Sequence, residues 1–302
     1  MSESDSTAQG VAKIRLAEQL RDRDTRICDD PLAKLFVRGS SVISCLGQRA
    51  NELLNDLAVP GLYSMIVARS RFFDDAVSSA VQNGATQLVV LGAGYCARAV
   101  RLKLDPKVKI FELDQRSVQL KKRQGYAKAR ADFQQEIARI NFITIDFNVE
   151  KVDEVLRKDP EFDPKAKTIF TLEGVTQYIP KEATINLLDS ICEVCPIGSH
   201  LIIGFVDQAT FDAPERVCGD GYPTRCLGRL LRLCKIVGEP WISAWTDGAF
   251  STIVEDHWRG RVERCVSTGD LSSVYFDPVG RSISSQNLLC TERWAHCVKT
   301  FE

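Results

Sequence analysis

The sequence predicts a doubly wound α/β fold with a mostly parallel sheet, N-terminal helices and a helical lid insertion late in the chain. Five short runs are apolar throughout, as in parallel strands that are covered on both faces. They are residues 87–91, 108–113, 141–145, 168–172 and 200–206. Helical patterns such as 116–138 and 181–195 separate them. This alternation is typical of one sheet with helices on both sides.

The residues before the first strand, 1–82, are predicted to form a helical cap. Residues 1–8 have the composition of a frayed polar tail, and the apolar spacing of 11–20 predicts a helix. Pro31 is expected at the first position of a further helix, where the N–H that proline lacks would be unpaired anyway. Residues 50–82 are mostly helical in pattern and end at Asn83-Gly84.

Residues 208–258 interrupt the alternation and are predicted to form the lid. They contain a helix near 225–237, with leucines beside four basic residues, and then the turn Gly238-Glu239-Pro240-Trp241. A basic amphipathic helix also occurs at membrane surfaces, but we favour a helix whose apolar side covers an active site. The last forty residues contain two strand-like runs, 261–266 and 294–300, which are compatible with antiparallel pairing. The whole chain, 1–302, is predicted to be a single domain.

Composition excludes several classes of partner. The 302 residues include 39 basic and 40 acidic side chains, a net charge of -1, so bulk attraction to nucleic acid or to an anionic membrane is not expected. No run approaches the roughly 20 apolar residues that span a bilayer, and the first ten residues do not resemble a signal peptide. We therefore predict a cytoplasmic protein with free thiols. The Cys192/Cys195 pair has no second pair at zinc spacing, so core packing is favoured and no metal is expected.

A glycine loop follows the first strand. Leu91 to Ala97 satisfies G-x-G-x-x-[GA], in which Gly92 and Gly94 allow a tight turn and close approach of a ligand to a helix N-terminus. The next strand ends in Glu112-Leu113-Asp114, where this fold places a carboxylate on ribose hydroxyls. Together they predict a cofactor that contains adenosine.

The ends of the later strands distinguish between two such cofactors. The third ends at Asp146-Phe147, the fourth at Glu173 and the fifth at Asp207. Ligands of open α/β sheets bind across the carboxyl ends of the strands, so these side chains are expected to converge. An acidic rim suits a sulfonium and an ammonium better than a pyrophosphate. S-adenosyl-L-methionine is therefore favoured over NAD.

Several motifs occur in a set order between Thr7 and Trp241. They are Thr7-Ala8 with Arg15, Asp30-Pro31-Leu32-Ala33, residues 69–75, residues 91–94, residues 111–115, residues 172–175 with Tyr178, and Gly238-Glu239-Pro240-Trp241. In this order and spacing they resemble the leucine carboxyl methyltransferase superfamily. The resemblance is closer to its branch of natural-product O-methyltransferases, the tetracenomycin carboxyl-methylating type. It implies a Rossmann-like class I methyltransferase fold.

The resemblance also implies roles at the methionyl end of the cofactor. Arg69, helped by Arg15, would pair with the cofactor carboxylate, as suits a planar bidentate donor. Glu173 would meet the amino group. Arg71 is the alternative to Arg69 if the alignment slips by two residues.

At the adenosine end, Gly92 would lie against the cofactor, in the same loop as Gly94, and Asp114 would hold the ribose. Asp146 and Phe147 would frame the adenine. Asp114, Glu173 and Arg69 are expected to hold the cofactor rather than the fold.

One position departs from the family pattern. The family usually has an aspartate two residues after the second glycine, where this chain has Cys96. A thiol does not replace an anionic acceptor, so the aspartate's contact must be absent or supplied elsewhere. Packing is favoured over a reactive role for Cys96.

The predicted function is S-adenosyl-L-methionine-dependent O-methylation of a small carboxylate or phenol, in secondary metabolism. Tyr178 is the candidate for orienting the acceptor. The sequence shows no compelling base, which favours a carboxylate narrowly, because a carboxylate is already ionised and a phenol needs a base. The alternatives are a protein C-terminal carboxyl methyltransferase, a NAD-dependent oxidoreductase and a non-catalytic cofactor-binding protein. No oligomeric state is predicted.

Overall fold

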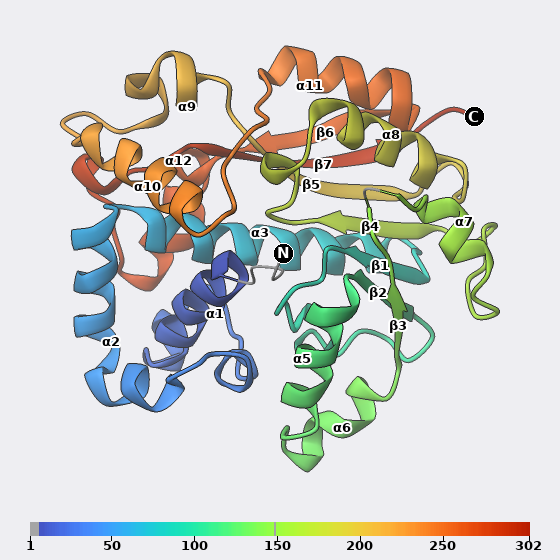
Figure 1. Ribbon diagram of the computed structural model, residues 1–302, viewed down its shortest axis with the longest axis horizontal. Helices are drawn as coiled ribbons and strands as arrows, with labels where there is room; N and C mark the ends of the chain where they lie inside the picture. The colour runs from blue at the N-terminus through green and yellow to red at the C-terminus, as the bar shows by residue number, and fades with distance from the viewer. Residues whose placement is uncertain (1–5, 148) are drawn as a thin grey trace.

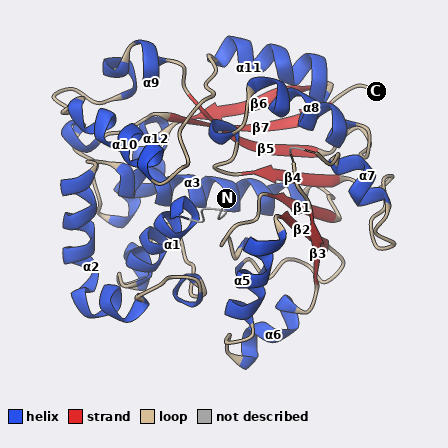
Figure 2. Cartoon of the chain, viewed as in Figure 1, coloured by secondary structure: helices blue, strands red, loops and turns tan. Residues whose placement is uncertain are grey.

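A computed structural model describes residues 6–147 and 149–302 and contains a seven-stranded sheet in the order β3-β2-β1-β4-β5-β7-β6 (Figures 1 and 2). The first five strands pair in parallel, and β7 runs antiparallel to both β5 and β6. The strands are β1 Gln87–Leu91, β2 Lys109–Asp114, β3 Ile140–Thr144, β4 Thr168–Leu172, β5 His200–Val206, β6 Gly260–Val266 and β7 Glu292–Lys299. The predicted α/β fold is confirmed, with the last two strands added antiparallel.

Helices cover both faces of this sheet (Figure 2). Those before β1 are α1 Ser6–Gln19, α2 Ser40–Ala58 and α3 Leu62–Gln82. Those between the parallel strands are α4 Arg98–Arg101, α5 Arg116–Tyr126, α6 Ala131–Ile137, α7 Val152–Arg157 and α8 Lys181–Cys192. Those after β5 are α9 Ala209–Asp212, α10 Arg225–Ile236, α11 Asp247–Ile253 and α12 Thr268–Leu271.

The apolar strands divide their side chains between cores on opposite faces. On β1, Leu88 and Val90 join the core under α3, whereas Val89 and Leu91 join the core under α7, α8 and α11. This is the period of two that a strand imposes on its side chains. The edge strand β3 is only half-buried beyond Ile140, so the expectation of a run buried on both faces does not hold there.

Two N-terminal expectations are wrong. Residues 6–8, predicted as a frayed tail, already belong to α1, because this turn packs against the carboxyl end of the sheet. Pro31 does not start an α-helix. It precedes a single 3₁₀ turn, Ala33–Leu35, and α2 begins only at Ser40.

The expected core role of the CxxC pair is confirmed. Cys192 and Cys195 are buried, and their thiols donate to the carbonyl oxygens of Trp258 and Ile191, both at 3.3 Å. Among residues 6–147 and 149–302, no His, Cys, Asp and Glu side chains group in a way that could hold a metal ion. Within the same residues, no helix has the length and apolar character to cross a membrane.

Candidate active site

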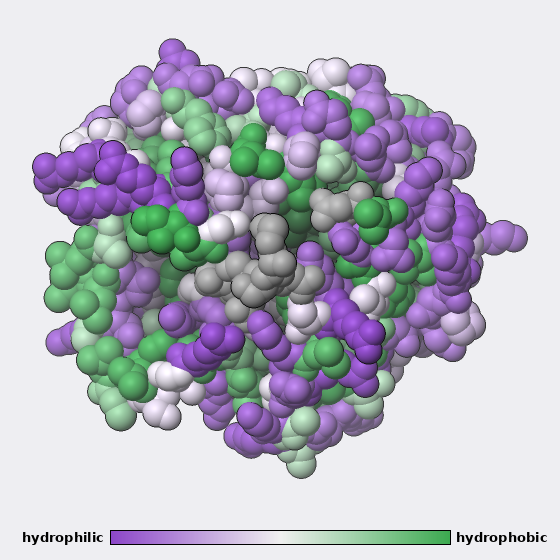
Figure 3. Space-filling view, viewed as in Figure 1, coloured by the Kyte–Doolittle hydropathy of each residue, from purple (hydrophilic) through white to green (hydrophobic). Residues whose placement is uncertain are grey.

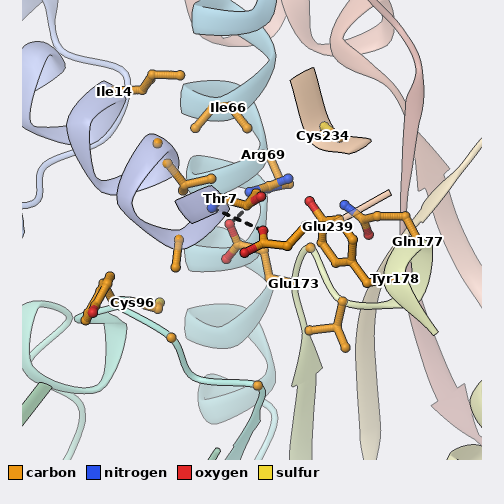
Figure 4. Close-up of a pocket in the computed structure, with 18 of the residues that line it drawn as sticks. Thr7, Ile14, Ile66, Arg69, Cys96, Glu173, Gln177, Tyr178, Cys234 and Glu239 are labelled. Carbon is orange, nitrogen blue, oxygen red and sulfur yellow. Dashed lines mark hydrogen bonds and ion pairs between the residues drawn. The ribbon is translucent and has the colours of Figure 1, made fainter. Parts of the chain in front are cut away.

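A cavity of about 560 Å³ opens at the carboxyl ends of the parallel strands (Figure 4). Segments from the whole length of the chain wall it: α1, α3, the loops after β1 and β4, α10 and the start of β7. The predicted site residues that line it are Arg15, Arg69, Gly92, Gly94, Asp114, Phe147, Glu173 and Tyr178. One crevice therefore collects residues that are up to 163 positions apart in the sequence, from Arg15 to Tyr178.

The glycine loop and the end of β2 are joined directly. Gly94 N donates to Asp114 Oδ2 at 2.6 Å, and Gln115 N donates to Asp114 Oδ1 at 2.7 Å. Gly92 has φ +65°, and a Cβ at this position would lie 2.7 Å from Val175 Cγ2. Only glycine fits this conformation and this space without strain or a shift of Val175.

Behind the loop, Arg69 lies between two carboxylates. Its Nε donates to Glu173 Oε1 at 3.0 Å, and its Nη1 donates to both oxygens of Glu292 at 2.8 and 2.9 Å. Glu292 is the first residue of β7. Because β7 is antiparallel to β5, its first residue lies at the same edge of the sheet as the last residue of β5.

Arg98, at the start of α4, extends this network. Its Nη2 donates to Glu173 Oε2 at 2.8 Å, and its Nε donates to Asp74 Oδ1 at 2.7 Å. Arg101 binds the same Asp74 through Nη2 at 2.7 Å. Three arginines and three acids thus form one buried, charge-balanced cluster: Arg69, Arg98, Arg101, Asp74, Glu173 and Glu292.

Electrostatics keep Glu173 and Arg69 ionised at neutral pH. Burial alone would raise the pKa of Glu173, but Arg98 and Arg69 outweigh burial and lower it to about 2. Burial alone would lower the pKa of Arg69, and its two carboxylate partners raise it instead. Arg69 and Glu173 thus belong to buried ion pairs as well as to the cavity wall.

Two further arginines take different places. Arg15 Nη2 donates to Tyr95 O at 2.7 Å, and its Nε pairs with Asp30 at 2.9 Å, so Arg15 also braces the glycine loop. Arg71 pairs with Asp75 on the surface of α3 at 2.8 Å and does not line the cavity. The two-residue slip that would place Arg71 in the site is therefore wrong.

Three acidic side chains at strand ends lie outside the cavity wall. Asp146 is exposed and does not line the cavity, although Phe147 next to it does. Glu112 is buried against Lys122 Nζ at 2.7 Å; burial raises its pKa and Lys122 opposes this rise. Asp207 Oδ1 accepts from Ala209 N at 2.9 Å and caps α9. The structure does not bring these three acids into the predicted crevice.

Cys96 is half-buried and lines the cavity beside the glycine loop. Its sulfur lies 3.3 Å from Arg98 Nη1, which donates to it. Sulfur is a weak acceptor, but the guanidinium also holds Glu173 and Asp74. The neighbourhood of this position is thus organised by Arg98 and its two acids.

The outer half of the cavity is apolar. Its wall comes from α1, α3 and α10, and includes Ile14, Leu62, Met65, Ile66, the buried Leu230 and the exposed Leu233. Tyr178 lies at this end, close to Trp241 and Thr7. Burial raises the pKa of Tyr178 to about 12, although its two neighbours oppose the rise. Its hydroxyl therefore stays protonated and able to donate at neutral pH.

Apolar side chains also lie on the surface next to this half. Leu53, Leu54 and Leu57 of α2 are exposed, as is Ile236 of α10. Figure 3 shows apolar side chains gathered over both helices. Asn55, between these leucines, lines the cavity, so the apolar surface of α2 adjoins the cavity wall.

Arg98, Glu239 and Glu292 also line the cavity, and the sequence analysis assigned a role to none of them. Arg98 directly follows the glycine motif, and Glu239 lies in the quoted Gly238–Trp241 turn, so both carried a positional signal. Glu292 carried none, because only the antiparallel course of β7 brings it to Arg69.

Comparisons with known proteins show the family to which the chain belongs. The family model of the leucine carboxyl methyltransferases matches residues 8–192. A Rhodococcus jostii protein to which S-adenosyl-L-methionine-dependent methyltransferase activity is attributed is 32% identical over 219 residues, 68% of this chain and 69% of that protein. A Mycolicibacterium gilvum protein with the same attribution is 32% identical over 221 residues, 70% of each chain.

Among solved structures, a DUF574 family protein from Streptomyces avermitilis has a TM-score of 0.59 at 14% identity, covering 95% of this chain and 96% of its own. A Thermobifida fusca protein to which methyltransferase activity is attributed has a TM-score of 0.53 at 17% identity, covering 89% and 93%. At such identities the likeness shows the fold alone.

Proposed function

The chain belongs to the leucine carboxyl methyltransferase family and is an S-adenosyl-L-methionine-dependent methyltransferase, and we propose that it methylates an oxygen atom of a small molecule. One observation carries the proposal. A single cavity has a polar inner half at the glycine loop and an apolar outer half under α10. The first half suits a charged nucleoside cofactor and the second an apolar acceptor.

The polar half fits the cofactor chemically. The two glutamates take the Nε and Nη1 nitrogens of Arg69, so within the described chain its Nη2 edge is left for the cofactor carboxylate. Arg15 would support this contact through the loop that it braces. We assign the amino group to Glu173. Each contact would be a charge-assisted hydrogen bond in a site with little water.

The adenosine end would be held by the remaining predicted residues. Gly92 and Gly94 would let the backbone approach the cofactor, and Asp114 would accept from the ribose hydroxyls. Phe147 would cover the adenine. Asp146 would reach the adenine amino group only after turning toward the cavity, so we rank it below the others.

When bound, the cofactor supplies a methyl group on a cationic sulfur, which is reactive toward an oxygen in line behind it. The chain's own residues must hold that oxygen and exclude water. The apolar side of α10 would exclude water. This helix belongs to the proposed lid, residues 208–258, which faces the proposed N-terminal cap, residues 1–82. Tyr178, with its hydroxyl protonated, would donate to the acceptor and orient it.

The acceptor that suits the apolar half is a small aromatic or polyketide-like acid or phenol. Cavity walls made of leucine, isoleucine, methionine and tryptophan favour a ring-bearing molecule. No contact in the described chain specifically favours a protein C-terminus or a nicotinamide cofactor.

Titration calorimetry of the purified protein tests the proposed cofactor. S-adenosyl-L-methionine and S-adenosylhomocysteine are expected to bind, because the chain belongs to a methyltransferase family, and NAD and NADP are expected to give no heat of binding. Tight NAD binding without any response to S-adenosylhomocysteine would reverse the assignment.

Radiolabelled S-adenosyl-L-methionine tests the proposed acceptor. One lysate is separated at a size cutoff into a protein pool and a small-molecule pool, and each pool is incubated with the enzyme and the labelled cofactor. Label is expected in the small-molecule pool. Label confined to one protein band, and lost when that protein's C-terminal carboxylate is blocked, would refute small-molecule methylation.

Replacing Asp114 with alanine is expected to weaken S-adenosylhomocysteine binding by about 10- to 150-fold, since it removes a charge-assisted hydrogen bond of about 1.5–3 kcal/mol. Calorimetry on the folded variant measures the loss. Asp132→Ala, at an exposed position of α6, is the control and should bind as the parent does. Unchanged affinity in Asp114→Ala would remove Asp114 from the cofactor site.

A further inference from the structure

The turn that follows α10 brings a carboxylate into the cavity. Glu239 lines the cavity, and its Oε2 accepts from Thr7 N at 3.1 Å (Figure 4). Thr7 lies in the first turn of α1, where backbone N–H groups have no partner within the helix. The carboxylate is therefore held by a helix N-terminus on one side, and its other side is turned toward the cavity.

Glu239 differs from the other acids of the cavity wall. Glu173 and Glu292 each accept from arginine, and Asp114 accepts from two backbone N–H groups. Within residues 6–147 and 149–302, Glu239 forms no ion pair, and its hydrogen bond comes from a neutral backbone N–H. Unlike Glu173 and Glu292, Glu239 therefore contacts no described arginine or lysine.

Glu239 lies near residues that are proposed to hold the cofactor and the acceptor. Ala8, next to Thr7, lies 3.8 Å from the place where a Cβ of Gly94 would stand. Tyr178 is also adjacent to Thr7. The first turn of α1 thus joins Glu239, the acceptor-orienting Tyr178 and the glycine loop.

The same turn carries a further donor. The indole Nε1 of Trp241 is buried and lies close to the Tyr178 hydroxyl, but the two groups form no hydrogen bond of ordinary geometry. A buried donor without a well-placed partner costs about 1–3 kcal/mol, so an acceptor oxygen beside Trp241 and Tyr178 would be favoured. Trp241 thus offers a donor and Glu239 offers an acceptor, two residues apart in one turn.

The Trp241 donor and the Glu239 acceptor together suit a hydroxyl group on the acceptor molecule better than a carboxylate. A hydroxyl both donates and accepts, whereas an ionised carboxylate only accepts and would be repelled by Glu239. On the basis of the proposed function, we infer that Glu239 is the general base for a phenolic acceptor and that Trp241 hydrogen-bonds the reacting oxygen. A phenol is therefore favoured over a carboxylate as the group that is methylated.

The step balances without a further reactant. Glu239 takes the phenol proton as the oxygen forms a bond to the methyl carbon of S-adenosyl-L-methionine. The carbon–sulfur bond breaks, and its electron pair stays on sulfur. The products are an aryl methyl ether, S-adenosylhomocysteine and protonated Glu239, which returns its proton to solvent.

The first test needs no variant. The labelled product from the small-molecule pool is treated with alkali, which cleaves methyl esters to volatile methanol but leaves aryl methyl ethers intact. Label that stays with the aromatic product supports the inference, and label released as methanol overturns it. The absence of any label in that pool would instead refute the proposed function, and this inference with it.

The second test uses the purified labelled acceptor and the variant Glu239→Gln. We expect kcat to fall by about 10²–10⁴-fold near neutral pH, with S-adenosylhomocysteine affinity within twofold of the parent. Raising the pH should restore turnover by about tenfold per unit, because below its pKa near 10 the phenol increasingly ionises by itself. Glu215→Gln, an exposed glutamate of the same insertion, is the matched control and should leave the rate unchanged.

Two results of this second test would overturn the inference. One is a Glu239→Gln rate equal to that of the parent. The other is loss of S-adenosylhomocysteine binding in a folded variant, because this would show that Glu239 only anchors α1 through Thr7.

Discussion

Replacing Arg98 with methionine is expected to lower the free energy of unfolding by about 3–5 kcal/mol. Arg98 is 1% exposed and holds both Asp74 and Glu173, so its removal leaves two buried carboxylates short of positive charge. Equilibrium urea unfolding followed by circular dichroism measures the loss. The variant should also bind S-adenosylhomocysteine more weakly, since Glu173 and Cys96 lose a shared partner.

Arg71→Met provides the matched control. Arg71 also forms an ion pair with an aspartate, but both side chains of that pair are 45% exposed. Exposed pairs contribute at most about 1 kcal/mol, so this variant should unfold almost as the parent does. Equal losses in the two variants would mean that the buried cluster adds no stability beyond an ordinary surface pair.

The cluster also predicts a pH dependence. The pKa of Glu173 is lowered to about 2 in the folded chain, below the value of about 4.3 for a free glutamate. A group with a depressed folded pKa adds stability above its unfolded pKa and loses it as the pH falls toward the folded value. The part of parental stability that comes from Glu173 should therefore disappear between about pH 4 and pH 2.

Replacing Gly92 with alanine is expected to lower cofactor affinity and turnover by about 100-fold, the order of effect that an ångström of misplacement has on an active site. The residue has φ +65°, which costs an L-residue about 1–2 kcal/mol. A Cβ would also meet Val175 Cγ2 at 2.7 Å, so the loop or Val175 must move. Calorimetry with S-adenosylhomocysteine and single-turnover rates measure the two effects.

Gly84→Ala is the control that separates the effect of backbone strain from the effect of a shifted glycine loop. Gly84 has φ +92°, but a Cβ added there would meet no described atom within 4 Å beyond its chain neighbours, and the residue is remote from the cavity wall. This variant should lose stability comparably and keep full affinity. Full affinity in Gly92→Ala as well would show that the cofactor does not depend on the exact course of this loop.

The parallel strands were the most predictable part of the chain. The bounds of β1, β4 and β5 agree with the sequence prediction to the residue, and each of these strands is buried along its whole length. β2 and β3 are each displaced by one residue at both ends from the predicted ranges 108–113 and 141–145, and both have an exposed residue at one end. The first turn of α1 was missed because it is ordered by contacts with Glu239 and with the glycine loop at Gly94, which lie far away in the sequence, and not by local propensity.

The site was predictable where one strand end or one loop supplies a residue. Gly92, Asp114 and Glu173 line the cavity because each directly follows a buried strand. Partners that meet across the fold were not predictable: Arg69 and Glu292 are 223 residues apart, and no local pattern connects them. For the same reason the sequence showed that Glu173 could bind a ligand but not that it also bridges two arginines.

The antiparallel course of β7 affects how the protein folds while it is synthesised on the ribosome. β6 is hydrogen-bonded to the sheet through β7 alone within the described chain, and Glu292 at the start of β7 supplies the second counter-ion of Arg69. A nascent chain that has not yet released residues 292–299 from the exit tunnel can pair the parallel strands but not complete this ion cluster. Closure of the cavity therefore waits for β7, which delays cofactor capture until this strand has left the exit tunnel.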